Sequence, residues 1–246
     1  IEKLKDNNVN GIILDIRNNT GGSLNDVVDM SGLFIEQGPI VQVKSRDANP
    51  YLHNDRDDRV QYNGPLIIMV NENSASASEI IAAAMQDYGR AIIVGSPATF
   101  GKGSVQRFFN LDKAVAGNES LKPLGEVKIS VQKYYRVNGG STQIKGVIPD
   151  VILPDSYMYL EMGEKEYDNA MPYTEIAPQQ YAQNVVKIEH KQNIIDKSKA
   201  RVKASPDFTK IEQNAMRLKK NSDDTKSNLS LAAYSKEVEN LELEAK

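Results

Sequence analysis

The chain has 246 residues, of which 40% are apolar and 26% charged, and its formal net charge is −3. These values are ordinary for a globular protein that buries a core, and the missing cationic surplus argues against nucleic acid as a partner. Cysteine is absent, which excludes thiol nucleophiles, disulfides and thiolate metal sites. No apolar run reaches membrane-spanning length, so we expect a chain that does not cross a membrane. We also expect that it needs no metal or cofactor.

Short apolar runs alternate with helical patterns over the first hundred residues. Gly11 begins an apolar run typical of a strand that is covered on both faces in a parallel sheet. Further strands are predicted at 40–43, 65–70 and 91–94. Helices are predicted from Ser23 or Asn25 to about Phe34 and from Ser76 to Tyr88. The polar stretch 45–63 is typical of a loop or an edge hairpin, and the alternation predicts an α/β core.

The pattern changes after Lys102. Antiparallel strands are predicted at 103–110 and 125–137, and a last strand at 151–153. Residues 155–178 have a loop-like composition, and residues 179–246 are highly charged and helix-forming. We therefore expect a core over residues 1–154 and a mostly helical C-terminal region over residues 155–246.

Three alternating serines mark the predicted transition from strand to helix after Val70. A hydroxyl at this position is exposed, and the amide of Ala77 lies at the positive end of the helix. This makes Ser76 a candidate nucleophile. The alternative is purely structural, because Ser76-Ala-Ser-Glu79 matches a capping box. The pattern by itself favours capping and does not choose among Ser74, Ser76 and Ser78.

A serine nucleophile needs a base, and neither histidine has a suitable context. His53 lies in the polar stretch and His190 in the charged helical region. A lysine amine can take the role when burial lowers its pKa towards neutrality, and apolar Phe100 and Val105 flank Lys102. The alternative for Gly-Lys-Gly is a surface turn. A phosphate loop is excluded, since its first glycine is missing and glycine follows the lysine.

Five stretches carry a resemblance to a known family. They are GIILDIRNNTGG, SGLFIEQGPIVQV, NSASASEIIAAAMQDYGRAIIVG, TFGKGSVQ and KYYRVNGGSTQIKGVIPDV. The chain resembles the C-terminal processing peptidases, and within them the tail-specific branch, from residue 1 to about residue 220. The resemblance implies a core of stacked β-β-α units, as in crotonase and Clp protease, followed by a helical C-terminal extension.

The resemblance also implies roles for particular residues. The nucleophile falls on Ser76, the general base on Lys102, and the residue that positions the lysine on Gln106. In this chain one residue, within Ser-Pro-Ala-Thr-Phe, is added before Gly101, so that Lys102 follows Ser76 by twenty-six positions. The extra residue falls in a predicted loop, which should absorb it.

The oxyanion hole and one acidic residue complete the implied site. The oxyanion donors fall on the amides of Ala77 and Gly22, with Gly21 the less favoured choice. The acidic residue falls on Asp87. Because Asp87 lies eleven positions along the helix from Ser76, we expect it to support the structure rather than to transfer protons.

Relatives imply partners and a compartment. They act in the periplasm on proteins with apolar C-terminal tails, and some pair with adaptor lipoproteins. They also carry a PDZ-type module before the core, which leads us to expect an N-terminally truncated core without that module. The hypothesis is thus a serine endopeptidase with a Ser/Lys dyad. The alternative is an inert peptide-binding scaffold.

Overall fold

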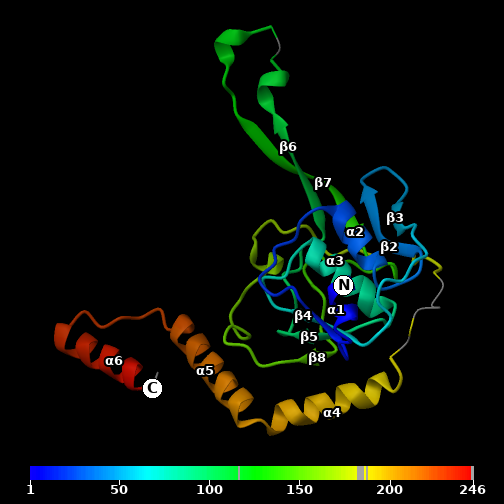
Figure 1. Ribbon diagram of the computed structural model, residues 1–246. Coiled ribbons are helices and arrows are strands. Elements are labelled where there is room, and N and C mark those ends of the chain that lie inside the picture. Colours follow the sequence, from blue (N-terminus) through cyan, green and yellow to red (C-terminus); the bar gives the residue numbers. More distant parts are fainter. Residues whose placement is uncertain (116, 182–185, 187, 245–246) are drawn as a thin grey trace.

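The computed structural model describes residues 1–115, 117–181, 186 and 188–244. Over this part of the chain the strands form one parallel and one antiparallel sheet of four strands each (Figure 1). The parallel sheet has the order β1-β4-β5-β8, with bounds Ile12–Asp15, Leu66–Val70, Ile92–Gly95 and Val151–Ile152. The antiparallel sheet has the order β3-β2-β7-β6, with bounds Tyr51–Asp55, Gly38–Ser45, Glu126–Tyr135 and Ser104–Asn110. The predicted α/β class is confirmed.

The parallel sheet corrects one expectation. The strand β1 was expected to be covered on both faces, but it lies at the edge of the sheet and pairs only with β4 among the described strands. Its residues alternate between half-buried and exposed, and Ile13 is 63% exposed. An apolar run shows that a strand forms but does not show whether a helix covers its second face.

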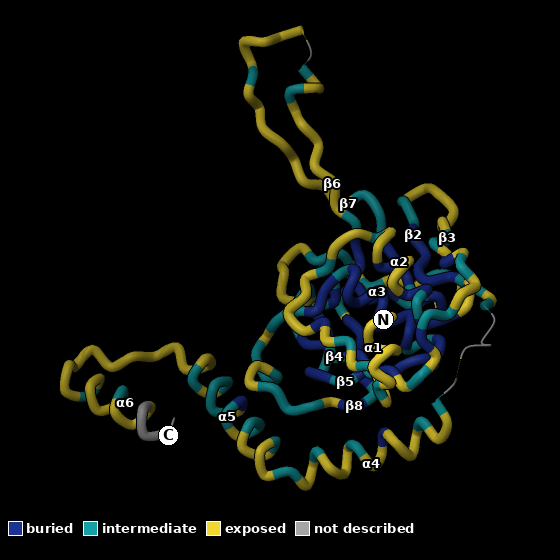
Figure 2. Tube along the Cα trace, viewed as in Figure 1, coloured by how far each residue is buried: buried dark blue, intermediate teal, exposed yellow. Residues whose placement is uncertain are grey.

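The helices α2 (Leu24–Gly32) and α3 (Ala77–Asp87) form a layer between the sheets. They pack against each other, and α3 contacts both β5 and β2. All residues of α3 from Ala77 to Met85 are buried, as expected for a helix enclosed on every side (Figure 2). Ser76 is the N-cap residue of this enclosed helix. A short helix, α1 (Glu2–Asp6), precedes β1.

The outer parts of β6 and β7 form an arm that extends away from the core (Figures 1 and 2). Its apolar side chains are exposed, among them Phe108 and Ile129. Near its tip lie the short 3-10 helices η1 (Leu111–Lys113) and η2 (Glu119–Leu121). Only the base of β7 pairs with β2, so the base of the arm is fixed to the core.

The C-terminal region begins as an irregular segment and ends in three helices within the described residues. These are α4 (Lys191–Ala204), α5 (Pro206–Asp223) and α6 (Leu231–Glu244), and η3 (Glu164–Glu166) precedes them. Helix was expected from residue 179, but the described residues between 179 and 190 are not helical. Residues 182–185 and 187 lie outside the described part. Helix α4 contacts β8 through Ile195. No helix in the described residues has both the length and the hydropathy to cross a bilayer.

Candidate active site

Ser76 occupies a sharp turn between β4 and α3. Its backbone has φ 56° and ψ −116°, a conformation that L-residues other than glycine rarely adopt. The usual N-cap backbone is extended, so this residue is strained for a simple cap. Strain of this kind persists only where the surrounding structure enforces it, and it is concentrated at functional sites.

The structure gives the three serines different environments. The Ser74 hydroxyl donates to the Ile16 carbonyl at 2.9 Å, and the Ser78 hydroxyl donates to the Asn19 carbonyl at 3.0 Å. Both side chains are buried and connect this turn to the loop after β1. Ser76 is half-buried, and the residue before it, Ala75, lines a cleft. These environments favour Ser76 as the candidate nucleophile, and its role remains a prediction.

The loop after β1 lies directly against this turn. A Cβ on Gly21 would lie 2.8 Å from both the Ala75 carbonyl oxygen and the Ser76 Cβ, and Gly21 has φ +107°, so only glycine fits. The Gly21 N–H already donates to Asn19 Oδ1 at 2.9 Å. That favours Gly22 over Gly21 as an oxyanion donor beside Ala77, and the assignment remains a prediction.

Reciprocal amide hydrogen bonds join the same two loops. The Asn18 N–H donates to Asn71 Oδ1, and Asn71 Nδ2 donates back to Asn18 Oδ1, each at 2.8 Å. Asn73 Nδ2 also donates to Asn18 Oδ1, at 3.1 Å. We call residues 71–79 together with residues 17–22 the serine corner. Its loops are fixed to each other before any substrate arrives.

Glu79 connects the serine corner to the lysine loop. Its carboxylate is fully buried, and Oε2 accepts from the amides of Ser76 at 2.8 Å and Lys102 at 3.0 Å. Oε1 accepts from the Thr99 hydroxyl at 2.6 Å and the Gly101 amide at 2.7 Å. Burial raises the pKa of Glu79 to about 7, although these four donors lower it. The capping-box glutamate thus holds both candidate residues by their main chains.

Lys102 lies beside the cleft that Ala75 lines. This cleft has a volume of about 670 Å³, and Lys102 and Gln106 contribute to its wall. Lys102 is half-buried, whereas Gln106 is exposed on β6. Among the described residues no ion pair involves the Lys102 amine. The structure brings Ser76, Lys102 and Gln106 to one region, and their roles remain predictions.

Tyr134, on β7, contacts both Ser76 and Lys102. Its hydroxyl donates to the Lys102 carbonyl. Burial raises the pKa of Tyr134 well above its ordinary value, whereas hydrogen bonds with the Thr142 and Ser76 side chains lower it. Its phenol therefore stays neutral and serves as a fixed dipole next to Ser76.

Asp87 lies at the other end of α3. Eleven helical residues correspond to roughly 16 Å, which places it far from Ser76. Arg136 binds its carboxylate through two nitrogens, at 3.0 and 2.6 Å, and Asn138 Nδ2 donates to it at 2.9 Å. These bonds fix the chain that follows β7. The geometry favours the expected supporting role.

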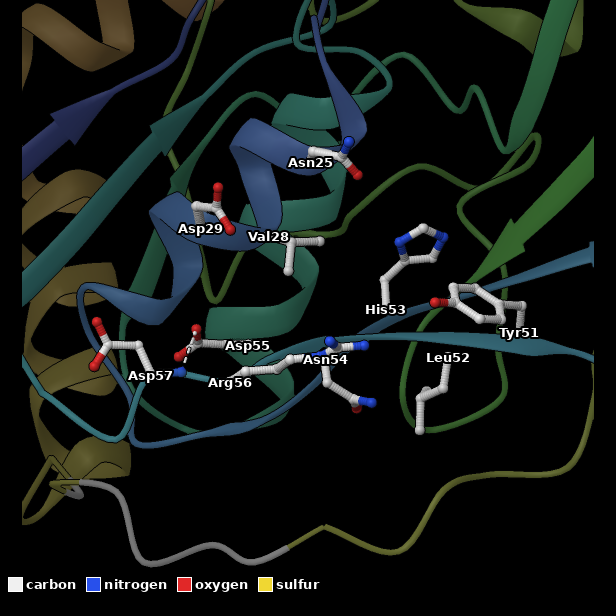
Figure 3. Close-up of a pocket in the computed structure, with 10 residues that line it drawn as sticks. All are labelled: Asn25, Val28, Asp29, Tyr51, Leu52, His53, Asn54, Asp55, Arg56 and Asp57. Atoms are coloured by element: carbon white, nitrogen blue, oxygen red, sulfur yellow. Dashed lines mark hydrogen bonds between the residues drawn. The ribbon is translucent and has the colours of Figure 1, made fainter.

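A second cavity, of about 510 Å³, lies on another part of the surface (Figure 3). Side chains of α2, including Asp29, face the strand β3 across it. His53 belongs to this cavity, and burial lowers its pKa. Neither Ser76 nor Lys102 lines this cavity, whereas Lys102 lines the same cleft as Ala75, which favours Lys102 over His53 as the base.

The sequence reasoning missed two residues of this site. The sequence identified Glu79 only as the glutamate of a capping box. That motif does not predict its hydrogen bonds with Thr99, Gly101 and Lys102. Tyr134 lay within the stretch KYYRVNGGSTQIKGVIPDV, and no role was predicted for it. A buried acceptor facing several amides could have been suspected from a glutamate in an otherwise apolar helix.

Comparison with known proteins identifies the class. Residues 1–153 match the model of peptidase family S41, which is more than half of the chain, and the chain belongs to that family. Residues 157–246 match the C-terminal domain of tail specific protease. The boundary between these matches lies near residue 155, and the division into domains itself remains a prediction.

Two individual relatives show which kinds of protease this chain is similar to. The chain is 43% identical to the tail-specific protease of Haemophilus influenzae over 86% of this chain and 30% of that protein. It is 34% identical to the carboxy-terminal-processing protease of Bartonella bacilliformis over 67% of this chain and 37% of that protein. The chain thus spans about a third of the length of these relatives.

Solved structures support the fold. The photosystem II D1 C-terminal processing protease superposes with a TM-score of 0.53 at 30% identity, covering 61% of this chain and 36% of that one. Mature CPAF complexed with lactacystin superposes with a TM-score of 0.51 at 15% identity, covering 61% and 41%. The second match concerns the fold alone. The two relatives and the first of these structures are named as proteases, which does not favour the inert scaffold.

Proposed function

We propose that the protein is a serine endopeptidase in which Ser76 is the nucleophile and Lys102 the general base. The observation that supports this most strongly is that the buried Glu79 carboxylate binds the amides of both residues. Two loops far apart in the sequence are thereby fixed side by side. Fixing a nucleophile and its base in advance removes much of the entropic cost of reaction.

In the proposed reaction the Lys102 amine takes the Ser76 proton as Oγ attacks the scissile carbonyl carbon. The resulting oxyanion accepts hydrogen bonds from the Gly22 and Ala77 amides, each of which should contribute about 10²–10³ in turnover. The C–N bond then breaks, and the leaving amine takes the proton from Lys102. Water hydrolyses the acyl ester on Ser76 by the same proton route. Gln106 orients the amine.

The substrates, compartment and partner are proposed from the family. We infer that the enzyme acts on proteins with apolar C-terminal tails, in the periplasm, and that an adaptor lipoprotein is a candidate partner. Support comes from the match of residues 157–246 to the C-terminal domain of tail specific protease. Cell fractionation and co-purification with epitope-tagged protein test the last two points.

Cleavage of an unfolded protein that ends in apolar residues tests the chemistry. Ser76→Ala and Lys102→Ala should each reduce cleavage by at least about 10³-fold, because the nucleophile and its base act as a unit. Ser120→Ala and Lys113→Ala, both exposed on the arm, are matched controls and should cleave normally. A fluorophosphonate should label Ser76. Undiminished cleavage by either active-site variant contradicts the dyad.

A further inference from the structure

The C-terminal region forms one side of the cleft that holds Lys102. From the core, the cleft is lined by residues that include Ala75, Phe100 and Lys102. Opposite them lie Glu164 and residues 167–171, all from the C-terminal region. We call residues 163–171 the cleft wall. Part of the candidate active site therefore lies outside residues 1–153, which match the peptidase family.

The beginning of the cleft wall is fixed to the lysine loop by main-chain contact. The Glu164 amide donates to the Phe100 carbonyl at 2.8 Å. Gly163 has φ +104°, and a Cβ there would lie 2.6 Å from the same carbonyl oxygen. Only glycine permits this approach. The wall therefore begins against Phe100, which is two residues before Lys102 in the sequence.

A buried amide fixes both ends of the wall. Gln143 is fully buried, and its Oε1 accepts from the Gly103 amide at 2.8 Å. Its Nε2 donates to Glu164 Oε1 at 3.2 Å and to the Met171 carbonyl at 3.0 Å. Gln143 therefore links the residue after Lys102 to the wall, so the wall and the lysine loop should move as one unit.

The wall presents an aromatic side chain to the cleft. Tyr167 is 60% exposed, and its ring centroid lies 6.4 Å from that of Phe100 with the planes inclined by 52°. Met171 and Ala170 add apolar surface to the same cleft. Tyrosine offers a large contact area at a small cost in conformational entropy, so an exposed tyrosine on a fixed wall is suited to binding.

We infer that Tyr167, Phe100 and Met171 form a subsite for an apolar or aromatic side chain of the polypeptide substrate beside the scissile bond. The inference rests on the proposed function, because it assigns the substrate side chain that the same cleft binds. On the wall itself the carboxylates of Glu164 and Asp168 disfavour an acidic side chain, whereas the cations Lys102 and Lys128 line the core side of the cleft. The C-terminal region thus selects the cleavage site.

Photo-cross-linking tests the subsite without turnover. In the Ser76→Ala background, Tyr167 is replaced by p-benzoylphenylalanine, and the protein is irradiated with a decapeptide that contains one central leucine. We expect a cross-link to the leucine and a clear loss of yield when that leucine is replaced by aspartate. Tyr51, which is 61% exposed and lines the other cavity, is the matched control position and should give no cross-link. No cross-link at position 167, or equal yields at both positions, overturns the inference.

Kinetics separate this inference from the proposed function. In Tyr167→Ala the preference in kcat/KM for leucine over alanine peptides should fall about 10-fold, as for other losses of apolar pocket contacts. Tyr167→Phe should retain the preference, and Tyr51→Ala should not change it. Cleavage with an unchanged preference and no cross-link refutes the subsite and leaves the peptidase intact. A specific cross-link without cleavage by the wild type supports the subsite and refutes the peptidase.

Discussion

The serine corner and the C-terminal region are held in different ways. The corner is fixed by hydrogen bonds between buried groups far apart in the sequence, such as Asn18 with Asn71 and Glu79 with Gly101. The irregular first part of the C-terminal region is bound to the core by hydrogen bonds as well, for example from Gln179 Nε2 to Gln42 Oε1 at 2.7 Å, whereas its helices touch the core at few points. Residues 163–171 contact the lysine loop, Lys191 pairs with Asp150 at 3.3 Å, and Ile195 packs on β8.

This difference indicates which parts of the molecule must be rigid for the proposed reaction. A reacting pair must be held within fractions of an ångström, and a network of satisfied buried groups provides that rigidity. Large exposed helices joined at few points open locally at a lower free energy than the core. Only the part of the C-terminal region next to Lys102 therefore needs the same precision as the corner.

The largest expected effect comes from Glu79→Ala. It leaves four donors without their acceptor, two of them buried and two half-buried, each worth about 1–3 kcal/mol, so the free energy of unfolding should fall by about 4 kcal/mol. Cleavage should be lost as well, because Ser76 and Lys102 are no longer held together. Urea unfolding and a peptide assay measure both. Glu126→Ala on an exposed strand is the control, and wild-type stability in Glu79→Ala would refute the network.

Asp87→Ala should lower the free energy of unfolding by about 3 kcal/mol, because the half-buried Arg136 loses its carboxylate partner and keeps only the bond to Gln86 Oε1. Cleavage per folded molecule should change little, since Asp87 lies at the far end of α3. The exposed Asp58→Ala provides the comparison for a lost surface charge. A stable but inactive Asp87→Ala protein would show instead that Asp87 takes part in the chemistry.

A pH dependence tests Glu79 without removing it. Burial raises its folded-state pKa from 4.5 to about 7, so between these values the unfolded chain loses a proton that the folded chain retains. The stabilising contribution is complete below pH 4.5 and is lost as pH rises to 7, by up to about 3 kcal/mol. In denaturant titrations the free energy of unfolding of the wild type should fall over this pH range, and that of Glu79→Gln should not show this fall. Parallel curves would mean that Glu79 is ionised in the folded protein across the range.

Ile195→Ala should cost about 2–3 kcal/mol, at the lower end of the range for buried isoleucine because its cluster is small. Hydrogen exchange should increase in α4 and remain slow in α3. Ile194→Ala, on the exposed neighbour, should change neither. Equal acceleration in both helices would show that the two regions unfold as one unit.

The smallest effect concerns the glycine pair. In Gly21→Ala the new Cβ collides with Ser76 and requires positive φ, so we expect about 1–3 kcal/mol and loss of cleavage. In Gly22→Ala the new Cβ has no heavy atom within 4 Å, so the fold should be unchanged. Thermal unfolding of the two variants makes the comparison. Destabilisation by Gly22→Ala of the same size would contradict the geometry.

Much of the secondary structure was predictable because it depends on local periodicity. The strands near residues 66–70 and 92–95 and the helix after Ser76 lie where the apolar pattern put them. The exposure of Ile13 was not predictable, since the pattern does not reveal which faces other elements cover. Nor were the hydrogen-bond partners of Ser74 and Ser78 predictable, because they are carbonyls more than fifty residues away.

By itself the sequence determined the order of strands and helices and the motifs that place this chain among the S41 peptidases. These depend on side-chain type and spacing along a short stretch. Only the tertiary structure decided that one carboxylate holds the Ser76 and Lys102 loops together and that a segment of the C-terminal region faces Lys102. Those arrangements result from contacts between residues distant in the sequence, whose free energy appears only once the chain has closed the loops between them.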